Sequence, residues 1–149
     1  MMKVAKLWAS CGGVGKLRGG GTVAALFFIL LWYFTAAYRL PLWAQLVFVL
    51  LIFFTGVVVS TRVEKEWGHD SNRVVIDEVS GMSISVLALP YQWYYLLFAF
   101  LLFRFFDIVK PLYIRRVENF RGGWGVMLDD VLAGIYSLLT LHLLIRILE

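Results

Sequence analysis

Long uncharged stretches alternate with short charged segments along the chain. Residues 19–38 and 40–61 form two such stretches of 20 and 22 residues, separated by Arg39. An apolar helix of about 20 residues crosses the roughly 30 Å of hydrocarbon in a bilayer. We therefore predict two membrane helices that form a hairpin, with Leu40 and Pro41 in the turn.

The third uncharged stretch, residues 79–103, is interrupted by Pro90. A proline inside a helix removes a backbone donor and clashes with the preceding turn. We therefore predict two helices, near residues 74–89 and 93–110, which form a shallow hairpin, and a last helix near residues 127–147. The predicted fold class is all-α, an integral membrane bundle of about five helices in a single domain, residues 1–149.

Composition supports a membrane location. The chain is 61% hydrophobic and 16% charged, against about 45–50% apolar residues in a typical soluble protein. So few polar side chains do not cover the apolar surface of a chain this short in water. The net charge of +4 is small and scattered, which argues against a nucleic-acid partner. The single cysteine, Cys11, excludes a disulfide within the chain.

The distribution of lysine and arginine predicts the orientation. With a hairpin at Pro90 and the N-terminus inside, cytoplasmic segments contain 12 of the 14 basic residues, as the positive-inside rule requires. A single helix through residue 90 would instead leave 8 inside and 6 outside. We therefore expect a multi-pass protein of the inner (cytoplasmic) membrane, with residues 62–78 and 104–130 on its cytoplasmic face.

Six of the ten carboxylates lie at predicted helix ends on that face. They are Asp70, Asp77, Glu78, Asp107, Asp129 and Asp130. Ionisable groups near membrane depth are costly, so they usually pair, bind ions or serve a function. A purely structural alternative is local pairing: Asp107 is three residues from both Arg104 and Lys110, and Asp77 and Glu78 suit a helix N-terminus.

The residue types near these carboxylates select the chemistry. Clustered carboxylates favour a hard cation, of which Mg²⁺ is the natural choice, whereas zinc would have only His69 as a nearby nitrogen ligand. Basic side chains interleaved with the acids suit a phosphate held between a metal and guanidinium groups; they are Arg73, Arg104, Lys110, Arg115 and Arg116. Glycine-rich stretches at 12–15, 19–21 and 122–125 are weak signals for an anion site.

Three motifs resemble those of the phosphatidylglycerophosphatase A family. Residues 69–82, with His-Asp and the run Val-Ile-Asp-Glu-Val-Ser-Gly-Met, together with Ala-Leu-Pro at 88–90, resemble its central motif. Residues 103–111, Phe-Arg-Phe-Phe-Asp-Ile-Val-Lys-Pro, resemble the second, and residues 122–134, Gly-Gly-Trp-Gly-Val-Met-Leu-Asp-Asp-Val-Leu-Ala-Gly, the third. The matches keep the family's order over residues 69–134. The family's Pro-Gly-Thr-x-Gly-Ser loop is replaced at 16–22 by Lys-Leu-Arg-Gly-Gly-Gly-Thr.

The resemblance implies an all-helical, magnesium-dependent phosphatase. It would remove the terminal phosphate of phosphatidylglycerophosphate, a membrane phospholipid, to give phosphatidylglycerol. We hypothesise that Asp77, Asp107, Asp129 and Asp130 contact Mg²⁺, and that Glu78 or Asp70 takes a proton from the attacking water. Phosphoryl charge would be neutralised by Arg104, Lys110 or Arg115.

Three other functions are compatible with the same residues. A phosphatase of another lipid phosphate would use the same site. A cation transporter would place its carboxylates along a path instead of at one face. In a noncatalytic membrane subunit, the charges would only anchor helices.

Overall fold

In the computed structural model, residues 1–69, 71–90 and 92–148 are described, and every regular element within them is a helix. In chain order the elements are α1 (Met2–Ala9), the 3-10 helix η1 (Cys11–Lys16), α2 (Gly20–Phe34), the 3-10 helix η2 (Ala37–Arg39), α3 (Leu42–Trp67), α4 (Ile76–Ser85), α5 (Trp93–Val109), α6 (Ile114–Val117) and α7 (Gly123–Leu148). The all-α prediction is confirmed. The helices outnumber the five expected, because the short elements α1, η1, η2 and α6 were not predicted.

Two helices, α3 and α7, are long and apolar enough to cross a membrane. Each has 26 residues, about 39 Å at 1.5 Å per residue. Only 22% of the most apolar window of each helix is buried inside the molecule. The core helix of a soluble protein would be mostly covered, whereas here large side chains such as Leu51 and Phe54 are exposed. Helix α2 is also apolar but has only 15 residues.

The chain breaks near Pro90, as predicted, but α4 is shorter than expected. It ends at Ser85, and α5 begins at Trp93. The hydroxyl of Ser85 donates to the carbonyl of Gly81 at 3.1 Å, and Ala88 has a positive φ of 53°, so the helical path is lost before the proline. With 10 residues, α4 measures about 15 Å, half of a hydrocarbon core.

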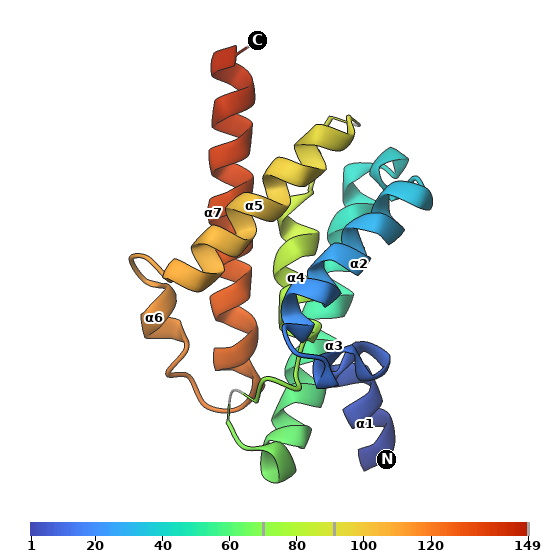
Figure 1. Ribbon diagram of the computed structural model, residues 1–149, viewed down its shortest axis with the longest axis vertical. Coiled ribbons are helices and arrows are strands. Elements are labelled where there is room, and N and C mark those ends of the chain that lie inside the picture. The colour runs from blue at the N-terminus through green and yellow to red at the C-terminus, as the bar shows by residue number, and fades with distance from the viewer. Residues whose placement is uncertain (70, 91, 149) are drawn as a thin grey trace.

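The helices run alternately up and down, so that their ends meet at one end of the bundle (Figure 1). Helices α2, α4 and α7 begin towards the end where the N-terminus lies, and α3 and α5 run back towards it. The long α7 then leads to the C-terminus at the opposite end. This arrangement brings together the helix ends that carry the predicted site residues.

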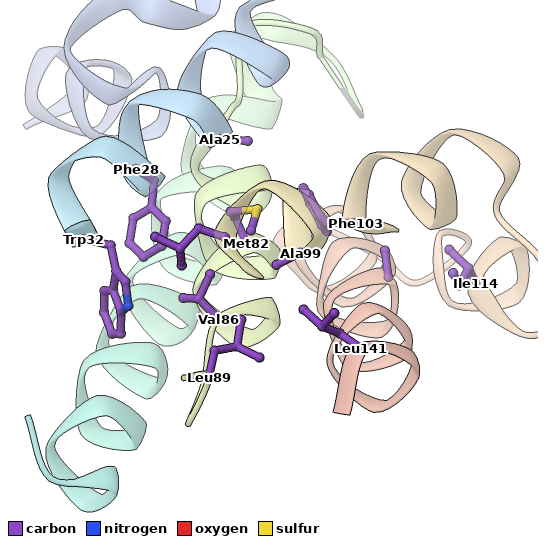
Figure 2. Close-up of a cluster of buried hydrophobic side chains, with 12 residues drawn as sticks. Ala25, Phe28, Trp32, Met82, Val86, Leu89, Ala99, Phe103, Ile114 and Leu141 are labelled. Carbon is purple, nitrogen blue, oxygen red and sulfur yellow. The ribbon is translucent and has the colours of Figure 1, made fainter. Parts of the chain in front are cut away.

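Helix α4 forms the centre of the bundle. The main hydrophobic cluster packs side chains of α2, α5 and α7 around Met82 of α4 and Val86, which follows the helix directly (Figure 2). Helices α4 and α7 touch through backbone: a Cβ added at Gly134 would lie 2.3 Å from the Gly81 carbonyl oxygen. Glycine at both positions therefore permits an approach that any side chain would prevent.

A buried glutamine joins two chain reversals at the far end of the bundle. Gln45 is 4% exposed. Its Nε2 donates to the Leu40 carbonyl at 2.8 Å, and its Oε1 accepts from the Ala88 amide at 3.3 Å. These bonds satisfy backbone groups of the two turns that have no partner within a helix. Gln45 thus fixes the loop after α4 against the turn before α3.

Candidate active site

Three carboxylates from α4 and α7 meet near the start of both helices. Asp77 and Glu78 lie in the first turn of α4, where the helix dipole favours negative charge. One carboxylate oxygen each from Asp77, Glu78 and Asp130 lie within 4.8 Å of one another. A Cβ at Gly81 would lie 2.4 Å from the Asp130 backbone oxygen, so the close approach of the two helices places Asp130 there. We call these three residues the carboxylate cluster.

Lys110 pairs with two acids beside this cluster. It caps α5 in a left-handed conformation, with φ of 47°. Its Nζ donates to Asp129 Oδ2 at 2.8 Å and to Glu118 Oε1 at 3.1 Å. Burial lowers the pKa of the Lys110 ammonium, but the hydrogen bonds and charges of Asp129 and Glu118 outweigh burial and raise this pKa above its ordinary value. Lys110 is therefore a permanent cation that holds Asp129.

Asp107 pairs within its own helix. Arg104 Nη1 donates to Asp107 Oδ2 at 2.5 Å, which is the local pairing that the spacing of three residues allows. Burial, then Asp77 and then the negative charge of Asp107 raise the pKa of the Glu78 carboxyl above its ordinary value. Asp107 therefore borders the carboxylate cluster while its own carboxylate holds Arg104.

A polar pocket of about 550 Å³ adjoins the cluster. Its wall is the segment before and at the start of α2, together with Asn72, Glu78 and Arg104. Three basic residues line it, Lys16, Arg18 and Arg104. The pocket also contains the N-terminus of α2, whose first amides lack helical acceptors and favour anions. The pocket therefore has the charge and donors that a phosphate group requires.

Gly21 allows the acidic and basic parts of the site to meet. A Cβ at this position would lie 1.7 Å from Glu78 Oε1. Any side chain larger than hydrogen would displace the Glu78 carboxylate. Glu78 is thus the residue shared by the carboxylate cluster and the polar pocket.

The pKa of the Cys11 thiol is raised by burial and by the negative charge of the site. Burial raises its pKa to about 12, and the charges of Asp77 and then Glu78 act in the same direction. A thiolate there would be poorly solvated and repelled by two carboxylates. Cys11 is therefore a neutral neighbour of the cluster.

The structure brings together most of the residues singled out from the sequence. Five of the six carboxylates gather in this region: Asp77, Glu78, Asp107, Asp129 and Asp130. Asp70 lies outside the described residues. Of the predicted phosphate-binding residues, Arg104 lines the pocket and Lys110 pairs with acids, whereas Arg115 is exposed on α6.

Some residues of this region were not assigned from the sequence. Lys16 and Arg18 line the polar pocket, and they lie between two glycine-rich stretches that were treated as weak signals. Their position on the predicted cytoplasmic side, before an apolar helix, was the available clue. Glu118 was missed because it lies in the connection after α6 and reaches Lys110 only through tertiary folding.

The donor set of the cluster fits a hard divalent cation. It consists of carboxylate oxygens, the ligands that Mg²⁺ prefers. Within the part of the chain that the structure describes, Glu78 Oε2 is buried without a hydrogen-bond partner. His69 is occupied elsewhere, since its Nδ1 lies 2.6 Å from Glu64 Oε1. A bound cation would relieve the repulsion between carboxylates packed so closely, and the grouping at one end of the bundle differs from a transport path.

Curated relatives match most of the chain. A protein of Bacteroides thetaiotaomicron, provisionally named a phosphatidylinositol-3-phosphatase, is 46% identical over 127 residues, which cover 81% of this chain and 80% of the relative. The phosphatidylglycerophosphatase A of Escherichia coli K12 is 37% identical over 120 residues, 78% of this chain and 69% of that protein. The phosphatidylglycerophosphatase A of Haemophilus influenzae is 42% identical over 98 residues, 64% and 60% respectively. No solved structure gives a significant match.

The family comparison covers nearly the whole chain. The sequence model of the phosphatidylglycerophosphatase A family matches residues 7–145. This range includes the carboxylate cluster, Lys110 and the wall of the polar pocket. The family resemblance expected from the three motifs is confirmed, and the chain belongs to the phosphatidylglycerophosphatase A family of phosphatases.

Proposed function

We propose that this protein is a magnesium-dependent phosphatase that hydrolyses the terminal monoester of phosphatidylglycerophosphate to phosphatidylglycerol and phosphate. The observation that carries this proposal is the carboxylate cluster beside a basic, glycine-walled pocket. A cation site next to an anion site is what phosphoryl transfer requires. The family relationship supports the reaction class.

The acidic half of the site would hold the metal. We assign Asp77 and Asp130 as the Mg²⁺ ligands, since Mg²⁺ is usually held by one or two carboxylates plus substrate phosphate and water. When bound, Mg²⁺ supplies electrostatic stabilisation of the phosphoryl oxygens and acidifies water. Asp107 and Asp129, expected from the sequence to be ligands, are assigned here to holding Arg104 and Lys110.

The basic half of the site would bind the phosphate. Arg104, Lys16 and Arg18 face the polar pocket and can donate to the phosphoryl oxygens. Asp107 fixes the guanidinium of Arg104 at 2.5 Å, so little side-chain freedom is lost when the phosphate binds.

Glu78 is the proposed general base because it faces both halves of the site. It takes one proton from a water molecule as the water oxygen bonds to phosphorus. The bond between phosphorus and the glycerol oxygen breaks, and that oxygen takes up a proton from solvent. The products are an alcohol and inorganic phosphate.

A second candidate substrate is phosphatidylinositol 3-phosphate. The Bacteroides relative, 46% identical over 81% of this chain, is the observation that favours it. Both lipids carry a phosphomonoester, so the same cluster and pocket serve either reaction. The two differ in the alcohol that leaves.

A substrate panel with matched variants tests the proposal. Phosphate release from phosphatidylglycerophosphate, phosphatidylinositol 3-phosphate and phosphatidic acid would be measured with magnesium and with a chelator. We expect Asp130→Asn to lose about a hundredfold in kcat/KM, or about 2.7 kcal/mol. Glu66→Gln removes a carboxylate that is paired with Lys6 outside the site and should remain active. Chelator-resistant turnover would contradict the magnesium assignment, and no release from any lipid would contradict the function.

Membrane orientation is part of the proposal. We place the site on the cytoplasmic face of the inner membrane, where the basic residues concentrate. In a Cys11→Ser background, cysteines at Arg121 and Arg39 should label from opposite sides with an impermeant thiol reagent, with position 121 cytoplasmic. Labelling of both from one side would refute this multi-pass topology.

A further inference from the structure

An apolar groove of about 1110 Å³ lies between α1, α2 and α3, with α4 as its floor. Phe27 and Leu31 line it from α2, Val58 from α3, and Trp8 from α1. Ile76 and Val79 of α4 face it from below. No carboxylate is among its lining residues in the described part of the chain, and the one charged side chain there is that of Arg62.

The groove exists because α2 and α3 separate below their turn. Near the turn, the Phe48 ring of α3 lies 6.3 Å from Phe28 and 5.9 Å from Trp32, centroid to centroid. Helix α4 packs against both helices, whereas few contacts join α2 to α3 directly. The rims stay open, since Phe27 and Val58 are 55% and 49% exposed. An apolar hollow of this size with open rims fits an apolar ligand.

The groove and the polar pocket share a wall. In the segment before α2, Cys11, Gly12 and Val14 line the groove, and residues 15–22 line the pocket. The first turn of α4 is divided in the same way. Ile76 and Val79 face the groove, while Glu78 faces the pocket. A molecule with a phosphate in the pocket and an alkyl chain in the groove would therefore pass over one short segment of this protein.

We propose that the groove binds one acyl chain of the lipid phosphomonoester and so sets the position of its phosphate in the polar pocket. The inference rests on the proposed function for the identity of the ligand. The continuity of an apolar hollow with a basic pocket selects an amphipathic anion. Binding an acyl chain there restricts the head group before chemistry.

Filling the groove should discriminate between substrates by chain length. Val58→Trp places a large ring in the groove, and Val47→Trp is its matched control. Both valines lie on α3 and are 49% exposed, but Val47 does not line the groove. The measured quantity is kcat/KM for long-chain phosphatidylglycerophosphate divided by kcat/KM for its dihexanoyl analogue. We expect Val58→Trp to lower this ratio about tenfold, because the ring would displace several methylenes of the acyl chain from the apolar groove, and Val47→Trp to keep the wild-type ratio. Equal ratios in the two variants would overturn the proposal.

Photolabelling tests the groove without turnover. Phosphatidic acid with a diazirine in one acyl chain would be incorporated into phosphatidylcholine vesicles with the full-length protein, and adducts mapped by mass spectrometry. The comparison probe is phosphatidylcholine with the same chain. We expect the phosphatidic acid probe to label Phe27, Leu31 and Val58 more than the comparison probe, and Val58→Trp, but not Val47→Trp, to reduce this labelling.

Equal labelling by the two probes would mean ordinary lipid contact and would overturn the groove assignment. If the protein hydrolyses no lipid monoester but labels as expected, the proposed reaction fails and the binding groove stands. If it hydrolyses the lipids but labels uniformly, the reaction stands and the groove fails.

Discussion

The contact between Lys110 and Asp129 distinguishes the acids that would bind the metal from those that hold basic side chains. The perturbation is a double-mutant cycle of Lys110→Met and Asp129→Asn. At 2.8 Å and an effective dielectric constant of about 20, the Coulomb attraction of such a pair is about 6 kcal/mol. The pair is well covered, since the side chains are 23% and 8% exposed. Desolvation offsets much of this attraction, and removing one partner of a buried pair typically costs about 3–5 kcal/mol.

We expect Lys110→Met to destabilise the protein by about 3 kcal/mol, near the lower limit because Lys110 is partly exposed. Asp129→Asn should cost less, about 1.5 kcal/mol, because Lys110 keeps its second acid, Glu118. The double variant removes both charges and should cost about 2.5 kcal/mol, below the sum of about 4.5 kcal/mol. The coupling energy is then about 2 kcal/mol.

The assay is reversible unfolding in mixed micelles, followed by circular dichroism, with and without magnesium. Additivity within about 0.5 kcal/mol would refute the pairing. A cost of Lys110→Met that disappears in millimolar magnesium would show that Asp129 serves the cation directly, as the sequence alone had suggested. Glu66→Gln, which is remote from Lys110, serves as the additive control.

Three further predictions follow from the geometry. Gly134→Val should lower the free energy of unfolding by about 3 kcal/mol or more, since its Cβ would lie 2.3 Å from the Gly81 oxygen. An unchanged free energy of unfolding would contradict the close helix contact. Arg104→Met should raise KM about tenfold through loss of a charged phosphate contact, whereas Arg115→Met, on the exposed face of α6, should keep the wild-type KM; the reverse order in steady-state kinetics would exchange their roles. Cys11, with its pKa at about 12, should react slowly with maleimide at neutral pH, and Glu78→Gln should speed the reaction because removing a negative charge lowers the thiol pKa; a slower variant would contradict that electrostatic link.

The helical segments were predictable because they depend on local composition. The two uncharged stretches predicted α2 and the start of α3 to within a few residues, although α3 continues to Trp67. The last helix was predicted from residue 127, four residues after α7 begins, and Pro90 separated α4 from α5. The end of α4 was harder to predict from the sequence. Ser85 bonds back to Gly81 within its own helix. Ala88 takes a left-handed conformation, and its amide donates to Gln45 of α3, a contact between residues distant in the sequence.

The composition of the site was also predictable, but its division was not. Charge counting placed Asp77, Asp107 and Asp130 at one end of the bundle, where the structure has them. Which acid meets which base depends on side-chain reach across the connection from α5 to α7, and no spacing in the sequence links Lys110 to Glu118. The pocket wall at Lys16 and Arg18 is likewise formed only when the N-terminal segment folds over the start of α4.

The contact of Gly81 with Gly134 fixes the distance between α4 and α7 at the site. Between most helices, side chains fill the gap, and repacking of those side chains changes the spacing by fractions of an ångström. Here two backbones touch, so the separation of α4 and α7 is set by atomic radii, which no rotamer change alters. Substitutions on the outer faces of these helices can therefore adapt the protein to different lipids while Asp77 and Asp130 keep their spacing. Because Gly81 and Gly134 have no side chains, the outer faces of α4 and α7 can accept substitutions without a change in the geometry of the carboxylate cluster.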